Sequence, residues 1–133
     1  MSETITMASA TVESGEGYAQ AIQVGHHKLT SDEGLAGGGK DSGPAPYQLV
    51  LAGLGACTSI TLQMYAKRKG WDIGRITVRL KIVREGEVER IERVLSSTAT
   101  LTAEQRDKLV EIAGKTPVTK TIMKGAKIET KLE

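Results

Sequence analysis

One long uncharged stretch constrains the fold of this chain more than any other feature. Between Tyr47 and Ala66 no residue carries a charge, and apolar residues fall on every side of a helical projection. Pro46 suits the first turn of a helix, where a missing N–H costs nothing, and Gly70 suits a left-handed helix end. A helix that is apolar all round is either buried at the centre of a domain or spans a membrane.

The polar residues within this stretch favour the buried helix. Its length would suffice to cross a bilayer. However, the strands and other helices of the chain need an apolar partner to pack against. We therefore expect a central helix and no membrane partner. Polar and small residues are spread along it, and the small ones predict the close approach of another backbone: Gln48, Ala52, Gly53, Gly55, Ala56, Thr58, Ser59, Thr61 and Gln63.

Composition sets the size and the expected assembly. The 133 residues predict a single domain over 1–133. Phe is absent and aromatic residues make up 3%, so few large side chains can cover the long helix, and we expect a second copy to do so in a homodimer. A net charge of +2 gives no reason to expect nucleic acid as a partner. A lone cysteine, Cys57, and no signal-peptide pattern predict a cytoplasmic protein.

Alternating patterns and end signals predict the other elements. The later hairpin carries charges of both signs, which is typical of a solvated face: Arg79, Lys81, Arg84, Glu87, Glu89 and Arg90. Its second strand also carries Glu92 and Arg93. The adjacent His26 and His27 would face opposite sides of a strand, so we expect no metal site and no cofactor. The elements are strands over 5–12, 18–24 and 26–29, a glycine-rich loop over 30–43, a hairpin of 76–83 and 88–101, helices beginning at Thr102 and at Thr116-Pro117, and a closing strand over 126–132.

The order of these elements and several motifs resemble the OsmC/Ohr family, the osmotically inducible and organic hydroperoxide resistance proteins. The motifs are Gly43-Pro-Ala-Pro-Tyr-Gln-Leu, Leu-Gly-Ala-Cys57-Thr-Ser-Ile-Thr-Leu, Ala-Lys-Arg-Lys-Gly-Trp71 and Lys-Thr116-Pro-Val-Thr-Lys-Thr. The resemblance implies an α+β fold in which two chains intertwine and their long helices pack at the centre against antiparallel sheets. It also implies a thiol-dependent peroxidase with its site at the dimer interface.

The resemblance assigns site roles residue by residue. Cys57 falls on the position of the cysteine that attacks the peroxide, whereas Thr116 occupies the position of the second, resolving cysteine. The family's glutamate would align at Tyr47, or at Gln48 in a neighbouring subgroup. The family's N-terminal arginine has no counterpart, because no arginine precedes Arg68. The resemblance therefore predicts Cys57 as catalytic and Tyr47, Gln48, Thr116 and His27 as lining residues; His26, His27 or Lys28 would supply the positive charge.

Three functions remain open from the sequence. The first is a single-cysteine peroxidase for organic hydroperoxides, in which an external thiol reduces the sulfenic acid of Cys57. The second is a non-catalytic relative whose interface pocket binds an apolar small molecule. The third is a purely structural dimer, in which Cys57 is a small buried hydrophobe, as free cysteines often are.

Overall fold

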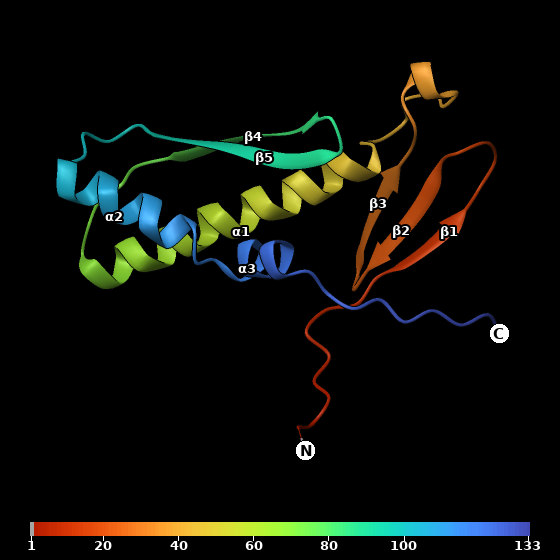
Figure 1. Cartoon of the computed structure of the whole chain (residues 1–133), viewed down its shortest axis with the longest axis horizontal. Coiled ribbons are helices and arrows are strands. Elements are labelled where there is room, and N and C mark those ends of the chain that lie inside the picture. The colour runs from red at the N-terminus through yellow and green to blue at the C-terminus, as the bar shows by residue number, and fades with distance from the viewer. Residues whose placement is uncertain (1) are drawn as a thin grey trace. The chain divides into compact units, whose positions relative to one another are not determined.

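The computed structural model describes residues 2–133, which form two compact units (Figure 1). The first unit ends at Val50 and the second runs from Leu51 to Glu133. The long helix α1 (Pro46–Lys69) crosses this boundary and connects the two units along the chain.

The first unit contains a three-stranded antiparallel sheet in the order β1-β2-β3, which confirms the predicted N-terminal hairpin. Its strands are β1 (Thr11–Ser14), β2 (Gln20–Val24) and β3 (His27–Ser31). The first strand begins later than the sequence suggested, because residues 2–10 form no strand. Ile5 and Met7 in this segment are 77% and 87% exposed. Without a surface to pack on, strand-like composition alone does not produce a strand.

A buried carboxylate closes the glycine-rich loop that leads to α1. Asp32 accepts hydrogen bonds from the backbone N–H groups of Glu33, Lys40 and Ser42 and from the Ser42 hydroxyl, at 2.8, 3.2, 3.1 and 2.7 Å. The Ser42 hydroxyl is the main reason why the pKa of Asp32 lies below its ordinary value. A short 3-10 helix, Leu35–Gly37, lies inside this loop. Three of the loop's amides thus turn inward onto a carboxylate.

The predicted ends of α1 are confirmed. The helix begins at Pro46 and ends at Lys69, and Gly70 follows with a φ of 71°. This left-handed conformation is readily adopted by glycine, which has no Cβ. Lys67, Arg68 and Lys69 occupy the last turn, where positive charge interacts favourably with the helix dipole.

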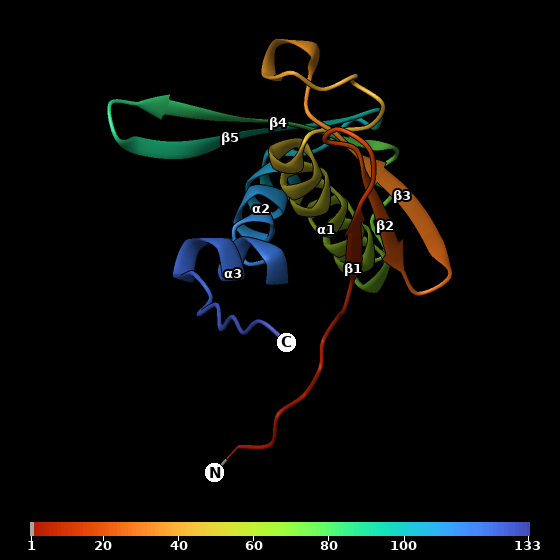
Figure 2. The same ribbon diagram turned by 90° about the vertical axis from the view of Figure 1, so that its right-hand side faces the viewer.

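In the second unit a two-stranded hairpin and two short helices pack on α1. The hairpin consists of β4 (Ile76–Glu85) and β5 (Val88–Ser97), and in Figure 2 its turn projects past the helices of this unit. A Cβ atom added at Gly55 would lie 2.9 Å from Cδ1 of Leu80 on β4. The glycine thus makes room for a leucine side chain, whereas the small residues were expected to allow the approach of another backbone. The core is formed by Leu62, Ala66, Ile73 and Leu109.

The helix that follows the hairpin begins at the predicted position, and a capping box forms its first turn. α2 (Ala103–Ala113) begins after Thr102, whose side chain accepts a hydrogen bond from the backbone of Gln105, while the Gln105 side chain bonds back to Thr102. The next helix, α3 (Pro117–Lys124), has Pro117 at its first turn and ends before Gly125, as predicted.

The prediction of a closing strand over 126–132 is wrong. Residues 125–133 form no strand, and Ile128 and Leu132 are 87% and 99% exposed. A strand requires a neighbour that takes up its backbone hydrogen bonds, and within residues 51–133 this segment pairs with neither β4 nor β5. Ile128, Thr130 and Leu132 therefore alternate as in a strand, but this segment has no strand to pair with within this unit.

The expected all-round burial of α1 is also only partly met within one chain. The buried face consists of Leu54, Thr58, Leu62, Tyr65 and Ala66. Ile60 and Met64, one turn apart on another face, are 54% and 60% exposed. α1 is long and apolar enough to cross a membrane, with a mean hydropathy of 1.4 over a window that is 28% buried. Length and composition are shared by spanning helices and the core helices of soluble domains, so this finding is weak evidence for a membrane span.

Candidate functional site

The single thiol of the chain lies in the middle of α1. Cys57 is half-buried and is not in a disulfide. The next residue, Thr58, is completely buried, and its hydroxyl donates a 2.7 Å hydrogen bond to the carbonyl of Leu54 one turn earlier. This hydrogen bond to the preceding turn fixes the Thr58 hydroxyl beside the turn of α1 that carries Cys57.

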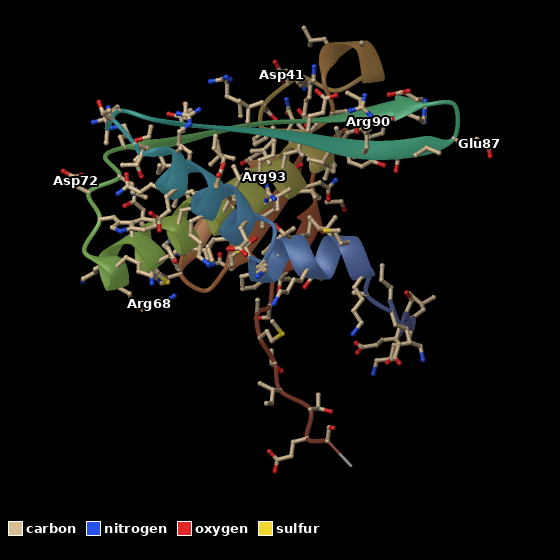
Figure 3. The ribbon with its side chains drawn as sticks, turned by 60° about the vertical axis from the view of Figure 1, so that its left-hand side comes forward. Asp41, Arg68, Asp72, Glu87, Arg90 and Arg93 are labelled. Carbon is tan, nitrogen blue, oxygen red and sulfur yellow. The ribbon has the colours of Figure 1, made fainter. Side chains whose placement is uncertain are left out.

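A guanidinium group from the hairpin reaches this turn. Arg93 on β5 donates from Nη1 to the hydroxyls of Thr58 and Thr119, at 3.0 and 2.9 Å. Its Nη2 donates to the carbonyl of Ala113 at 2.9 Å. In Figure 3 the Arg93 side chain is directed from the hairpin towards the helices. One side chain thereby connects β5 to α1, to the end of α2 and to α3.

Arg93 was not among the predicted site residues. The sequence placed it on the second strand of the hairpin, outside the set of charges assigned to a solvated face. Along β5 the half-buried side includes Ile91, Arg93 and Leu95, whereas Val94 is exposed. The period of two therefore places Arg93 between two apolar neighbours on the inner face of the strand. The signal that could have identified Arg93 from the sequence is a charged residue at an inward position of an alternating strand.

The charge on Arg93 is not neutralised by a carboxylate. Within residues 51–133 no Asp or Glu forms an ion pair with it. Burial lowers the pKa of Arg93, and the negative charge of a Cys57 thiolate acts in the opposite direction. The geometric link between the two is the Arg93 hydrogen bond to Thr58, the residue that follows Cys57 on α1. Arginine keeps its proton at any physiological pH, so this turn of α1 has a permanent positive charge beside it.

The position of the family's second cysteine belongs to the same cluster. Thr116 precedes the first turn of α3, as predicted, but its hydroxyl does not cap the helix backbone. It forms a 2.6 Å hydrogen bond with the hydroxyl of Thr119, which also lies 3.3 Å from the carbonyl of Ala113. Both threonines are buried. The structure thus brings Cys57 and Thr116 into one region through Arg93 and Thr119.

The other predicted lining residues lie in the first unit, which ends at Val50. Tyr47 is 60% exposed in the first turn of α1. The Oε1 atom of Gln48 accepts a 2.8 Å hydrogen bond from the backbone of Ala45. His27 begins β3 and is exposed, as is His26. Contact of Tyr47, Gln48 or His27 with the thiol stays a prediction, because it would be a contact between the two units.

A pocket of about 520 Å³ lies beside Arg93, within the second unit. Its apolar wall is formed by Leu54, Ile82, Ile91, Ile122 and Met123, and Thr119 and Arg93 contribute polar groups. Glu89 and Arg90 also line it. Across residues 2–133 there is no group of three or more His, Cys, Asp or Glu side chains that could hold a metal ion. The arrangement is an apolar pocket with a cation, and Leu54 in its wall precedes Cys57 by three residues on α1.

A family model describes most of this region. The model of OsmC-like proteins matches residues 38–131, which include α1, the hairpin and both short helices. No curated protein sequence matches the chain.

Solved structures with the same fold cover nearly the whole chain. It is similar to an OsmC-like protein from Mycoplasma pneumoniae, with 16% identity, a TM-score of 0.78 and coverage of 90% of this chain and 89% of that one. An organic hydroperoxide resistance protein OsmC from Legionella pneumophila gives 18% identity, a TM-score of 0.66 and coverage of 90% and 91%. The organic hydroperoxide resistance protein OhrB of Bacillus subtilis gives 24% identity, a TM-score of 0.62 and coverage of 87% and 90%. The mixed fold with three helices and antiparallel sheets is therefore confirmed, and the chain belongs to the family of OsmC-like proteins.

Proposed function

We propose that this protein is a thiol-dependent peroxidase for organic hydroperoxides in the cytoplasm, with Cys57 as its nucleophile. Family membership supports the general association with hydroperoxide resistance, since several proteins of this fold carry that description. The observation that carries the proposal is the hydrogen bond from Arg93 to the hydroxyl of Thr58, the residue next to Cys57; Arg93 is a cation with no carboxylate partner in residues 51–133. A nearby positive charge favours the thiolate, which is the reactive form of cysteine.

The first step is the attack of the Cys57 thiolate on the terminal oxygen of the hydroperoxide. A sulfur–oxygen bond forms, the oxygen–oxygen bond breaks, and the alkoxide that leaves takes up a proton to become an alcohol. The sulfur is oxidised to a sulfenic acid while the peroxide is reduced by two electrons. Arg93 remains charged throughout, and its hydrogen bond to Thr58 holds this positive charge beside the turn of α1 that carries Cys57.

The second step requires a thiol from outside the chain. Cys57 is the only cysteine, so its sulfenic acid cannot condense with a second cysteine of the same chain. An external thiol instead condenses with it, which releases water and leaves a mixed disulfide. A second molecule of the external thiol then attacks this disulfide, which regenerates the Cys57 thiol and releases the oxidised reductant.

Mass spectrometry with dimedone, a reagent that traps sulfenic acids, tests the proposal. One equivalent of cumene hydroperoxide should convert Cys57 to a dimedone adduct in the native protein. The Cys57→Ser variant, treated in the same way, is the control and should show no adduct. If Cys57 remains an unmodified thiol in the folded protein, the peroxidase proposal is wrong.

A second candidate function is the binding of an apolar small molecule without catalysis. The pocket of about 520 Å³ beside Arg93 favours it, because pockets of this size with apolar walls and few polar groups are typical of small-molecule sites. Binding in the Cys57→Ser variant, together with an unreactive thiol in the native protein, would support this second function over the first.

We also propose that the protein is a homodimer. Ile60 and Met64 leave an apolar face of α1 exposed in the single chain, next to small residues such as Ala56. A self-complementary contact between two such faces would bury both helices at once. The glycines and alanines of α1 would allow the two helix backbones to approach closely.

A further inference from the structure

We propose that the pocket beside Arg93 binds aliphatic carboxylates, with the carboxylate head on the Arg93 guanidinium and the hydrocarbon tail along the apolar wall. The inference specifies a ligand class for the binding function above. It does not depend on the chemistry of Cys57, so it can be tested in a chain that lacks the thiol. Three properties of the pocket carry it: unused donors, an uncompensated charge and an apolar wall.

The first property is the set of N–H groups that Arg93 leaves free. A guanidinium has five N–H donors, and contacts within residues 51–133 use three of them: two on Nη1 and one on Nη2. Nη1 binds Thr119 and Nη2 binds Ala113, and these two acceptor oxygens lie 3.3 Å apart. We infer that both bonds use the end of the guanidinium that Nη1 and Nη2 share. The donors left are Nε–H and the second Nη2–H, which lie parallel along one edge. Such an edge binds the two oxygens of a carboxylate together.

The second property is the charge at this end of the pocket. Arg93 is half-buried and its three partners are neutral hydroxyl and carbonyl oxygens. Arg90, which also lines the pocket, is bound to Glu85 and Glu92 on the hairpin surface. Glu89 is the one carboxylate among the lining residues, and it is exposed. An anionic head is therefore favoured at Arg93 and not at the position of Glu89.

The third property is the wall opposite the charge. Side chains from α1, both strands and α3 form it: Leu54, Ile82, Ile91, Ile122 and Met123. Four of these residues are aliphatic and unable to form hydrogen bonds, and methionine adapts its shape to irregular ligands. A tail without polar groups fits this wall, and the volume of about 520 Å³ lies within the usual range for small-molecule sites. A small inorganic anion would leave the wall empty.

Calorimetric titration of the Cys57→Ser protein with decanoate, below its micelle-forming concentration, tests the proposal. We expect saturable binding of one decanoate per chain. Octanoate should bind on the order of tenfold more weakly, because each methylene withdrawn from the wall costs about 0.8 kcal/mol. Decylammonium, with the same tail and a positive head, should not bind.

Variants separate the head from the tail. Arg93→Met should weaken decanoate binding by roughly ten- to a hundredfold, since it removes charge-assisted hydrogen bonds. Arg79→Met, which alters an exposed arginine of the same hairpin, is the matched control and should bind normally. Ile122→Asp on α3 should prevent decanoate binding, although it leaves Arg93 intact. Glu89→Gln should leave decanoate binding unchanged or strengthen it by up to about threefold.

Nuclear magnetic resonance of the Cys57→Ser chain, whose arginine is intact, gives an independent readout. The Nε–H signal of Arg93 should move downfield as decanoate is added, and the Nε–H signal of Arg79 should stay in place. The proposal is overturned if no saturable binding occurs, as when a second copy of the chain fills the pocket. It is also overturned if decylammonium binds as well as decanoate, or if the folded Arg93→Met variant binds decanoate normally.

Discussion

The Nη1 atom of Arg93 lies 2.9 Å from the hydroxyl oxygen of Thr119, three residues beyond the position where the OsmC/Ohr pattern has its second cysteine. The hydroxyl of Thr119 in turn lies 2.6 Å from that of Thr116, which occupies that position. A chain of hydroxyls anchored on a guanidinium thus stands where the resemblance would place a redox-active thiol.

Replacement of Arg93 by methionine should destabilise the fold. The change removes hydrogen bonds to Thr119 and Ala113, so their buried oxygens lose a donor, while methionine fills a similar volume. We expect the free energy of unfolding to fall by about 1–3 kcal/mol, measured by urea denaturation. The Arg79→Met variant should change it by less than about 0.5 kcal/mol, because an exposed side chain away from such features contributes little. Equal stability of the two variants would contradict the structural role of Arg93.

A cysteine at position 116 should restore a redox pair. In the Thr116→Cys variant, the sulfenic acid of Cys57 should condense with the new thiol to form an intrachain disulfide and water. Cumene hydroperoxide should therefore cause the loss of two thiols per chain, and mass spectrometry of a proteolytic digest should find the two peptides joined. The Thr121→Cys variant places a thiol on the exposed side of α3 and is the control, which should form no such link. A free thiol at position 116 after oxidation of Cys57 would refute the prediction.

The loop of the first unit should lose its carboxylate clamp in acid. Hydrogen bonds, mainly from the Ser42 hydroxyl, lower the pKa of Asp32 in the folded protein below that in the unfolded chain. The contribution of Asp32 to stability is therefore present above the unfolded pKa of about 3.9 and is lost as the pH falls through the lower, folded value. The amide signals of Lys40 and Ser42 should shift together with a midpoint below about 3.9. The Asp32→Asn variant should show no such titration and should be less stable at pH 7.

An acidic residue on the exposed face of α1 should dissociate the proposed dimer. Ile60 is 54% exposed in the single chain, and Ile60→Asp would place an unpaired charge between the two helices. Light scattering with size-exclusion chromatography should give the mass of two chains for the native protein and of one chain for the variant. Val110→Asp changes a valine on α2 that is 65% exposed and should leave the mass unchanged. A native protein that is monomeric would contradict the proposal.

Local signals made much of the fold predictable. Pro46 and Gly70 gave the two ends of α1, because each acts through its own backbone geometry. The reciprocal bonds of Thr102 and Gln105 gave the start of α2 for the same reason. These features depend on residues a few positions apart. These helix ends therefore form in the same way whatever packs against them.

Features that depend on distant residues were not predictable in this way. The segment 126–132 alternates like a strand, but a strand forms only where another one accepts its hydrogen bonds. No site role was predicted for Arg93, because in the sequence it is one of three charged residues on the second hairpin strand, with Arg90 and Glu92. Its actual partners, Thr58, Ala113 and Thr119, are 35, 20 and 26 residues away in the sequence. Nothing local shows that three helices supply acceptors to one strand residue.

The rate at which cumene hydroperoxide oxidises Cys57 in the native protein and in the Arg93 variants tests the account most directly. Arg93→Lys keeps the charge and Arg93→Met removes it, so the rate at pH 7 should fall slightly in the first variant and on the order of tenfold in the second. The Arg79→Met variant should react as fast as the native protein. Equal rates for native protein and a folded Arg93→Met variant, or no oxidation of Cys57 in either, would contradict the account.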